Sequence, residues 1–152
     1  MNFEKEYIKF WSEFGKGKKM VLSSSLNNIV TSRMMSIVYF EEKLYFQTDK
    51  LFRKYEQLKG NPHISLCIDN IQIEGKCKEV GKPKENINFC NIYKELFPNS
   101  FKNYSLLENE RLFEVTPNFI QRWIYIDNIP YIEIFDIKNK KYILKEYFIN
   151  NK

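Results

Sequence analysis

The sequence has 152 residues, of which 43% are hydrophobic and 16% aromatic, and a disordered chain would carry far fewer aromatic side chains. No apolar run approaches the ~20 residues that a membrane-spanning helix needs. The start of the chain, with Glu4 and Glu6, is untypical of a secretory signal. We therefore expect a single cytoplasmic domain over residues 1–152, with no membrane partner.

The net charge of +5 is the one compositional feature that points to a partner. Only four of the 24 basic residues are arginines, and the lysines follow no clear pattern. This distribution favours a solvated lysine surface over a nucleic-acid interface, so we expect no nucleic-acid partner. The arginines are the more informative cations, because a planar guanidinium suits a specific anion.

Metal chemistry has little support in the sequence. The three cysteines are widely spaced, with no C-x-x-C pair, and His63 is the sole histidine. Since a zinc site needs three or four suitably spaced ligands, we expect no metal site. His63 follows Pro62 at the start of a predicted strand, where a solvent-facing or partly satisfied imidazole is the ordinary outcome.

A helix is predicted at the start of the chain. Its aromatic residues recur at helical spacing and share one face, Asn2 provides a cap, and Gly15 and Gly17 end the helix. We expect this face to pack on the body of the protein through Phe3, Tyr7, Phe10, Trp11 and Phe14.

Strand patterns follow the helix. Residues 20–24 and 29–40 read as strands, and the second turns back into a strand over 44–48 to make a hairpin. The long strand is apolar on both faces around Met34-Met35, so we expect both faces to be covered. A short helix is predicted over 52–59, ended by Gly60-Asn61-Pro62.

The rest of the chain has further strand patterns and one helical pattern. Residues 64–68 and 71–77 predict a second antiparallel hairpin, and 83–96 has a helical pattern that Pro98-Asn99-Ser100 breaks. Further strands are predicted over 113–116, 120–126, 131–137 and 142–148, the last two as a closing hairpin. These short, mostly antiparallel strands predict a mainly β fold with flanking helices, a small closed barrel.

One group of polar residues indicates a binding site. Arg33 lies inside an apolar strand, Thr48 ends the next strand of the hairpin, and Arg53-Lys54 opens the following helix. If the hairpin brings them together, an arginine, a lysine, a hydroxyl and a helix N-terminus make a site for a phosphate. The alternative is that Arg53 and Lys54 are exposed helix cations and that Arg33 pairs with a nearby glutamate.

These residues also carry a resemblance to a known family. The run Arg33-Met34-Met35-Ser36, then Leu44-Tyr45-Phe46-Gln47-Thr48, then Arg53-Lys54-Tyr55-Glu56-Gln57-Leu58-Lys59-Gly60-Asn61-Pro62, resembles the pyridoxamine 5'-phosphate oxidase-like family. The likeness continues through Ile71-Gln72-Ile73-Glu74-Gly75 and covers residues 20–80 well. It implies an FMN-binding split β-barrel of antiparallel strands, and a homodimer with the cofactor at its interface.

The resemblance also implies a set of cofactor-binding residues. Arg33 and the backbone of Met34, Met35 and Ser36 would line the flavin phosphate and ring edge. Gln47 and Thr48 would contact the ribityl-phosphate end, and Arg53 and Lys54 would hold the phosphate. Asn70 stands where oxidase members carry a longer glutamine that touches the flavin.

The chain departs from the oxidases of this family in ways that bear on substrate. Phe52 replaces the serine that precedes Arg-Lys, and Val38 stands where pyridoxine-phosphate oxidases have a lysine. The Tyr…Arg…Ser cluster and the C-terminal Arg-x-His pair of those oxidases are also absent. The run over 112–117, followed by Arg122-Trp123, is more similar to general-stress flavoproteins and nitroimidazole-resistance reductases.

The resemblance therefore implies an FMN-dependent oxidoreductase acting on a small molecule, such as a nitroreductase or flavin reductase, with NAD(P)H as a candidate electron donor. No G-x-G-x-x-G run is present for a tightly held nicotinamide, and we assign no catalytic side chain. Trp123, Tyr125 and Tyr131 are candidates to cover the flavin ring, with a place in the core as the alternative. Two other functions stay open: a flavin- or haem-binding protein without turnover, and a basic nucleic-acid-binding barrel.

Overall fold

The aromatic helix forms as predicted and packs on the β-sheet. The computed structural model describes residues 2–147. Helix α1 (Phe3–Phe14) begins at Asn2, whose side chain accepts a hydrogen bond from the Lys5 backbone N–H. All five predicted aromatic residues are at most 9% exposed, and the Trp11 ring stacks on Tyr39 with centroids 3.9 Å apart.

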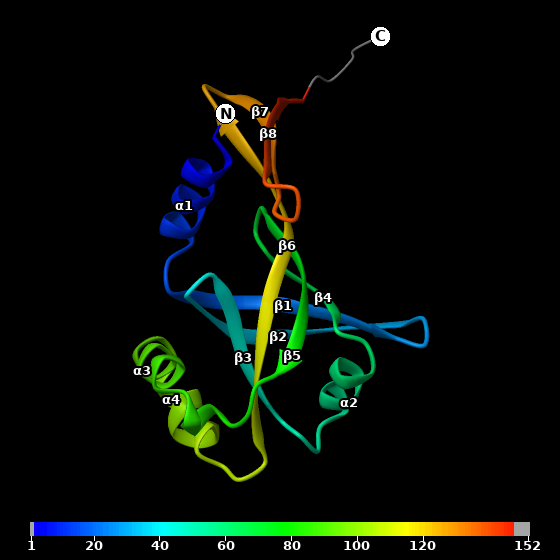
Figure 1. Ribbon diagram of the computed structural model, residues 1–152, viewed down its shortest axis with the longest axis vertical. Helices are drawn as coiled ribbons and strands as arrows, with labels where there is room; N and C mark the ends of the chain where they lie inside the picture. The colour runs from blue at the N-terminus through cyan, green and yellow to red at the C-terminus, as the bar shows by residue number, and fades with distance from the viewer. Residues whose placement is uncertain (1, 148–152) are drawn as a thin grey trace.

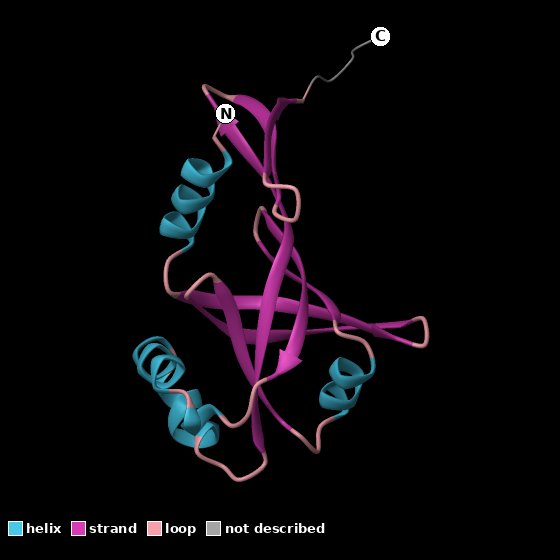
Figure 2. Cartoon of the chain, viewed as in Figure 1, coloured by secondary structure: helices cyan, strands magenta, loops and turns pink. Residues whose placement is uncertain are grey.

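Eight strands of residues 2–147 form one antiparallel sheet, in the order β3-β2-β1-β4-β5-β6-β7-β8. A further pairing of β3 with β6 closes the first six strands into a barrel, and β7 and β8 extend beyond it (Figure 2). The predicted class, a mainly β split barrel of antiparallel strands with flanking helices, is confirmed. The strands are β1 (Gly17–Leu26), β2 (Ile29–Phe40), β3 (Lys43–Asp49), β4 (His63–Ile68), β5 (Ile71–Glu79), β6 (Glu110–Ile126), β7 (Ile129–Asp136) and β8 (Lys141–Glu146).

The predicted hairpins are confirmed, with longer strands than the pattern indicated. Asn27 and Asn28 form the β1–β2 turn with φ of 53° and 65°, in the left-handed region that asparagine tolerates. The closing hairpin forms as β7 and β8. Phe148, the predicted end of its second strand, lies outside the described residues.

One strand prediction is wrong. Residues 110–126 form the single strand β6, where the sequence predicted two strands separated near Pro117. Pro117 faces Gly75, at the point where the register between β5 and β6 shifts. Because a bulge leaves a ladder position unpaired, it accommodates a residue that has no N–H to donate.

Helices α2 (Arg53–Gly60), α3 (Ile87–Leu96) and α4 (Pro98–Ser100) flank the end of the barrel away from β7 and β8, with α2 on one side and α3 and α4 on the other (Figure 1). Helix α1 lies nearer to β7 and β8. Pro98-Asn99-Ser100 ends α3 as predicted but starts a further helical segment, since proline suits the first position of a helix. None of the described helices is long and apolar enough to cross a membrane. The helical elements are α2 (Arg53–Gly60), η1 (Pro83–Glu85), α3 (Ile87–Leu96), α4 (Pro98–Ser100) and the π-helical turn η2 (Phe101–Ser105).

Two apolar cores hold these layers together. The larger one fills the barrel and the face covered by α1, and includes Met35, Phe46 and Phe113. The smaller one lies outside the barrel, where Phe89 and Tyr93 of α3 cover strand residues such as Val38. Val38, one of the departures from the oxidases, is therefore a fully buried packing residue.

Candidate functional site

Three cations predicted to bind phosphate do converge. Arg33 of β2 and Arg53 and Lys54 of α2 line one open hollow of about 490 Å³, which we call the cation hollow. The hairpin and the helix that follows it place these side chains together, as the sequence predicted. The remaining lining residues are Thr31, Ser32, Phe52 and Gln57.

Neutral acceptors hold the Arg33 guanidinium in place. Its Nη2 donates to Thr31 Oγ1 at 2.6 Å and to Gln57 Oε1 at 2.8 Å, while its Nη1 donates to Ser24 Oγ at 3.0 Å and to the Leu22 carbonyl at 3.2 Å. No glutamate of the described chain pairs with it, in contrast to the alternative interpretation of the sequence. Arg33 is therefore rigidly oriented but keeps its positive charge uncompensated.

The whole cluster lacks counter-ions. Of the ion pairs that residues 2–147 form, none involves Arg33, Arg53 or Lys54. Burial lowers the pKa of Arg33 and of Lys54, and the like charges act in the same direction, Arg53 on Arg33 and Arg33 on Lys54. The Lys54 ammonium has only a weak acceptor, the Met35 sulfur at 3.6 Å. An anion bound here relieves this repulsion.

A second cavity, of about 370 Å³, adjoins the cation hollow and shares Phe52 and Lys54 with it. We call it the ligand cavity. It lies between β2, β3, the start of α2 and the helical segment that precedes β6. It contains five more of the predicted cofactor-binding residues, and is lined by Met34, Met35, Ser36, Gln47, Thr48, Asp49, Phe52, Lys54, Tyr93, Ser100, Tyr104, Leu107 and Glu110.

Side chains of the helical segment close one wall of the ligand cavity. Ser105 of η2 is fully buried, and its Oγ donates to Gln47 Oε1 at 2.7 Å. Tyr93 donates to Ser100 Oγ at 3.1 Å. Phe52 places its ring 5.5 Å from Lys54 Nζ, so this position offers an aromatic face where the family has a serine hydroxyl.

The ligand cavity also contains an acid that the sequence analysis missed. Glu110 begins β6 directly opposite Asp49 of β3 and is only 5% exposed. Burial and the Asp49 charge raise the pKa of Glu110 to about 7, and Lys54 partly opposes this shift. Pairing of β3 with β6 joins positions far apart in the chain, so no local pattern marks Glu110 as part of the site.

The chain is similar in fold to several solved structures. No protein-family model matches the sequence, and no curated protein matches it. General stress protein 26 from Bacillus anthracis is a solved structure with a TM-score of 0.58 and 22% identity, over 77% of this chain and 91% of that one. The pyridoxamine 5'-phosphate oxidase-related, FMN-binding protein from Nostoc punctiforme has a TM-score of 0.59 at 12% identity, over 86% and 87%. HutZ, the haem storage protein from Vibrio cholerae, has a TM-score of 0.57 at 18% identity, over 77% and 91%.

The chain has the split-barrel fold of the pyridoxamine 5'-phosphate oxidase-like proteins. The fold predicted from the residue runs over 33–62 is therefore confirmed, although the identities are low.

One predicted residue of this split barrel lies outside both hollows. Asn70 is in the β4–β5 turn, and its Nδ2 donates to the Trp123 carbonyl at 2.6 Å. Trp123 and Tyr125 are exposed on the part of β6 that extends beyond the barrel, and neither lines the ligand cavity. A role for these residues at a flavin stays a prediction.

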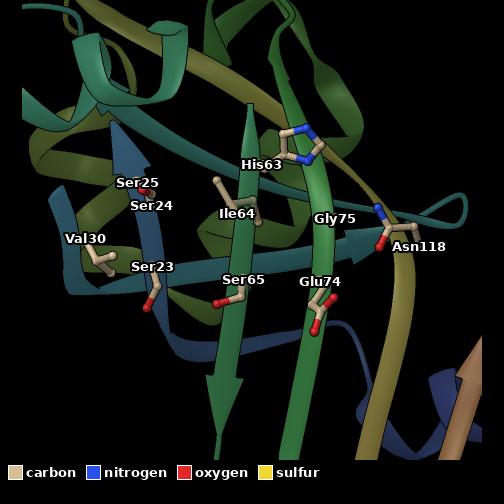
Figure 3. A pocket seen from close by; sticks show the side chains of 10 residues that line it. All are labelled: Ser23, Ser24, Ser25, Val30, His63, Ile64, Ser65, Glu74, Gly75 and Asn118. Carbon is tan, nitrogen blue, oxygen red and sulfur yellow. The ribbon is translucent and has the colours of Figure 1, made fainter. Parts of the chain in front are cut away.

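A third hollow of the split barrel, about 310 Å³, lies on the sheet surface across β1, β4 and β5 (Figure 3). We call it the serine hollow. Ser23, Ser65 and Glu74 stand side by side across these strands, and Ser23 is hydrogen-bonded to Ser32 at 2.8 Å. His63 faces solvent here, as predicted. Among residues 2–147, no cluster of histidine, cysteine or acidic side chains has the arrangement of a metal site.

Proposed function

We propose that this protein binds FMN, with the phosphate on the cation hollow and the rest of the cofactor in the ligand cavity, and that it is an FMN-dependent oxidoreductase acting on a small molecule. NAD(P)H is the proposed electron donor, and a nitro compound or a free flavin is the proposed acceptor. The observation that carries the proposal is the cluster of Arg33, Arg53 and Lys54, which has no ion-pair partner within residues 2–147 and opens onto a cavity.

The residues present fit a phosphate monoester. Arg33 is fixed in orientation before any ligand binds, because both of its Nη atoms already donate two hydrogen bonds each. Its positive charge and its one remaining donor, the Nε–H, therefore cost little entropy to use. Phe52 caps α2 with no side-chain hydrogen bond, which leaves N–H groups of the first turn free to face an anion. Thr48 adds a hydroxyl on the cavity side. FMN supplies the redox chemistry when bound, and the protein binds and orients it.

The proposal includes a homodimer that covers the mouth of the ligand cavity. Four cavity-lining side chains, Met34, Phe52, Tyr104 and Leu107, are each more than 50% exposed, which is costly for large apolar groups gathered in one place. A second copy of the chain would bury them. Sedimentation analysis tests this part: we expect a dimer for the native chain and a monomer for Leu107→Glu, and a monomeric native chain rejects it.

A haem-binding protein is the second candidate, and the fold shared with HutZ is the observation that favours it. Haem carries two propionates, so the same cations would suit it. Absorbance separates the two, because haem gives a Soret band and FMN gives bands in the blue and near ultraviolet.

A nucleic-acid-binding barrel is supported only by the net charge of +5, and it predicts binding that weakens steeply with salt. We also propose a cytoplasmic location, on the sequence grounds given above.

The test of the proposed enzyme is flavin reduction. In purified protein loaded with FMN, NADH or NADPH should reduce the flavin, and its visible absorbance should disappear. A nitro compound or a free flavin from a panel of acceptors should then reoxidise the flavin and restore the absorbance. Binding of FMN without reduction by either donor would leave a flavin-binding protein whose donor is not a nicotinamide. Failure to bind FMN rejects the proposal altogether.

A further inference from the structure

Glu110 is a buried acid whose carboxyl has no hydrogen-bond or ion-pair partner in the described part of the chain. The backbone of Glu110 is satisfied, because its N–H donates to the Leu107 carbonyl at 3.2 Å and its carbonyl accepts from Arg111 Nη1 at 2.8 Å. Within residues 2–147, no ion pair and no hydrogen bond involves its carboxyl oxygens. Since the residue lines the ligand cavity, the free carboxyl belongs to the surface that a ligand would meet.

The charges around Glu110 come from three elements. Asp49 faces it across the β3–β6 ladder, Lys54 reaches it from α2, and Tyr93 of α3 lies near enough for Glu110 to contribute to the raised pKa of that hydroxyl. Arg111, the next residue of β6, is turned toward Glu79 at 3.6 Å. Like charges directly opposite in a ladder are destabilising, so Lys54 alone among these groups favours the ionised form of Glu110.

We propose that Glu110 couples phosphate binding to the uptake of a proton: it becomes protonated when a phosphate monoester dianion binds to Arg33, Arg53 and Lys54. This inference rests on the proposed function. A dianion at the cation hollow would engage Lys54 and leave Asp49 and Glu110 beside three new negative oxygens. Protonation of the buried, unpartnered Glu110 is then the least costly way to reduce the repulsion. It neutralises the carboxylate, and no side chain has to move.

The direction of the pH dependence follows from the pKa of Glu110, which burial and Asp49 raise to about 7. A bound dianion raises this pKa further, so the protonated protein binds the phosphate better. Affinity is therefore highest between about pH 6, above which the phosphate monoester is mostly a dianion, and pH 7, and it falls as the pH rises further. A bound dianion also opposes the effects that lower the pKa of Lys54, and the comparison with a Glu110 variant isolates the contribution of Glu110.

The experiment measures FMN binding by titration calorimetry in two buffers of different ionisation enthalpy, with native protein, Glu110→Gln and Glu56→Gln. The amide of Glu110→Gln mimics the protonated acid. Glu56 is an exposed glutamate of α2 outside the ligand cavity, so Glu56→Gln removes the same charge near the cations without touching Glu110. Thermal melting confirms that each variant is folded before it is titrated.

At pH 7.5 we expect native protein and Glu56→Gln each to take up about 0.7 proton per FMN, and Glu110→Gln less than about 0.2. Between pH 6.5 and pH 8.0 the Kd of native protein should rise about fivefold, with a much smaller rise for Glu110→Gln. Equal proton uptake by native protein and Glu110→Gln, with FMN still bound, overturns the role of Glu110 and leaves the proposed function standing. A tenfold loss of affinity in Glu110→Gln at pH 6.5 also overturns it, because that result indicates a direct ligand contact. Absence of FMN binding in every variant rejects both proposals.

Discussion

The cation hollow and the serine hollow differ in what their polar groups already do. Two hydroxyls of the serine hollow are already bonded to neighbouring side chains: Ser23 bonds to Ser32 at 2.8 Å, and Ser24 Oγ accepts from Arg33 Nη1 at 3.0 Å. In the cation hollow Arg33 is fully oriented, yet neither it nor Arg53 nor Lys54 has an acidic partner within residues 2–147. Depth does not separate the two hollows, since both are open. The sign and number of the charges do, because three cations gathered without an acidic partner are the feature that a bound anion relieves. The serine hollow has instead one carboxylate, Glu74, which accepts from Gln72 Nε2 at 3.1 Å.

The largest effect should come from removing two of these cations. We expect Arg53→Ala with Lys54→Ala to weaken FMN binding about 100-fold, and at least tenfold, because each removes a charge-assisted hydrogen bond to the phosphate. Quenching of FMN fluorescence measures the Kd. Lys59→Ala is the matched control, since Lys59 lies on the same helix and pairs with Glu79 at 3.2 Å. An unchanged Kd in the double variant would show that the cation hollow does not bind the phosphate of FMN.

A smaller effect should come from the residue that orients Arg33. Gln57 is buried and accepts hydrogen bonds from Arg33 Nη2 and from Thr31 Oγ1 at 3.0 Å. Gln57→Leu keeps the volume but removes one of the four hydrogen bonds that orient the guanidinium and leaves one Nη2–H unpaired, so we expect FMN affinity to fall about fivefold. Riboflavin, which lacks the phosphate, should bind both proteins equally. If riboflavin loses as much affinity as FMN, Gln57 acts on the shape of the cavity and not through Arg33.

The smallest effect should come from the serine hollow. We expect His63→Ala combined with Ser65→Ala to change the Kd for FMN less than about twofold, because neither side chain lines the cation hollow or the ligand cavity. The same fluorescence titration checks this expectation. A tenfold loss would show that the two hollows belong to one site, and the contrast drawn above would fail.

The sequence predicted what local pattern determines. The spacing of aromatic residues located α1, and alternation with Asn-rich turns located the hairpins. The quoted run over 33–62 located the cation hollow, because its three cations come from one hairpin and the helix directly after it. Gln57 lies in that run, but its hydrogen bond to Arg33 joins α2 to β2, so the sequence did not predict its place beside the cations.

What the sequence missed depends on pairing between distant segments. β6 is one strand because the β5–β6 bulge accommodates Pro117, and a bulge is not visible in one strand alone. Glu110 meets Asp49 only through the β3–β6 ladder that closes the barrel. Tyr93 and Leu107 reach the ligand cavity because the helical segment before β6 packs on the barrel. Each of these contacts forms only when segments that are far apart in the sequence pair or pack as the barrel closes.

FMN binding by the purified native protein tests the central claim most directly. Titration of FMN with the protein at pH 6.5 should quench the flavin fluorescence to an endpoint of one FMN per chain, while riboflavin should bind at least tenfold more weakly because it lacks the phosphate. Fluorescence that stays unchanged at protein concentrations of about 100 μM would contradict the account, since the oriented Arg33 and the unpaired Arg53 and Lys54 would then have another purpose.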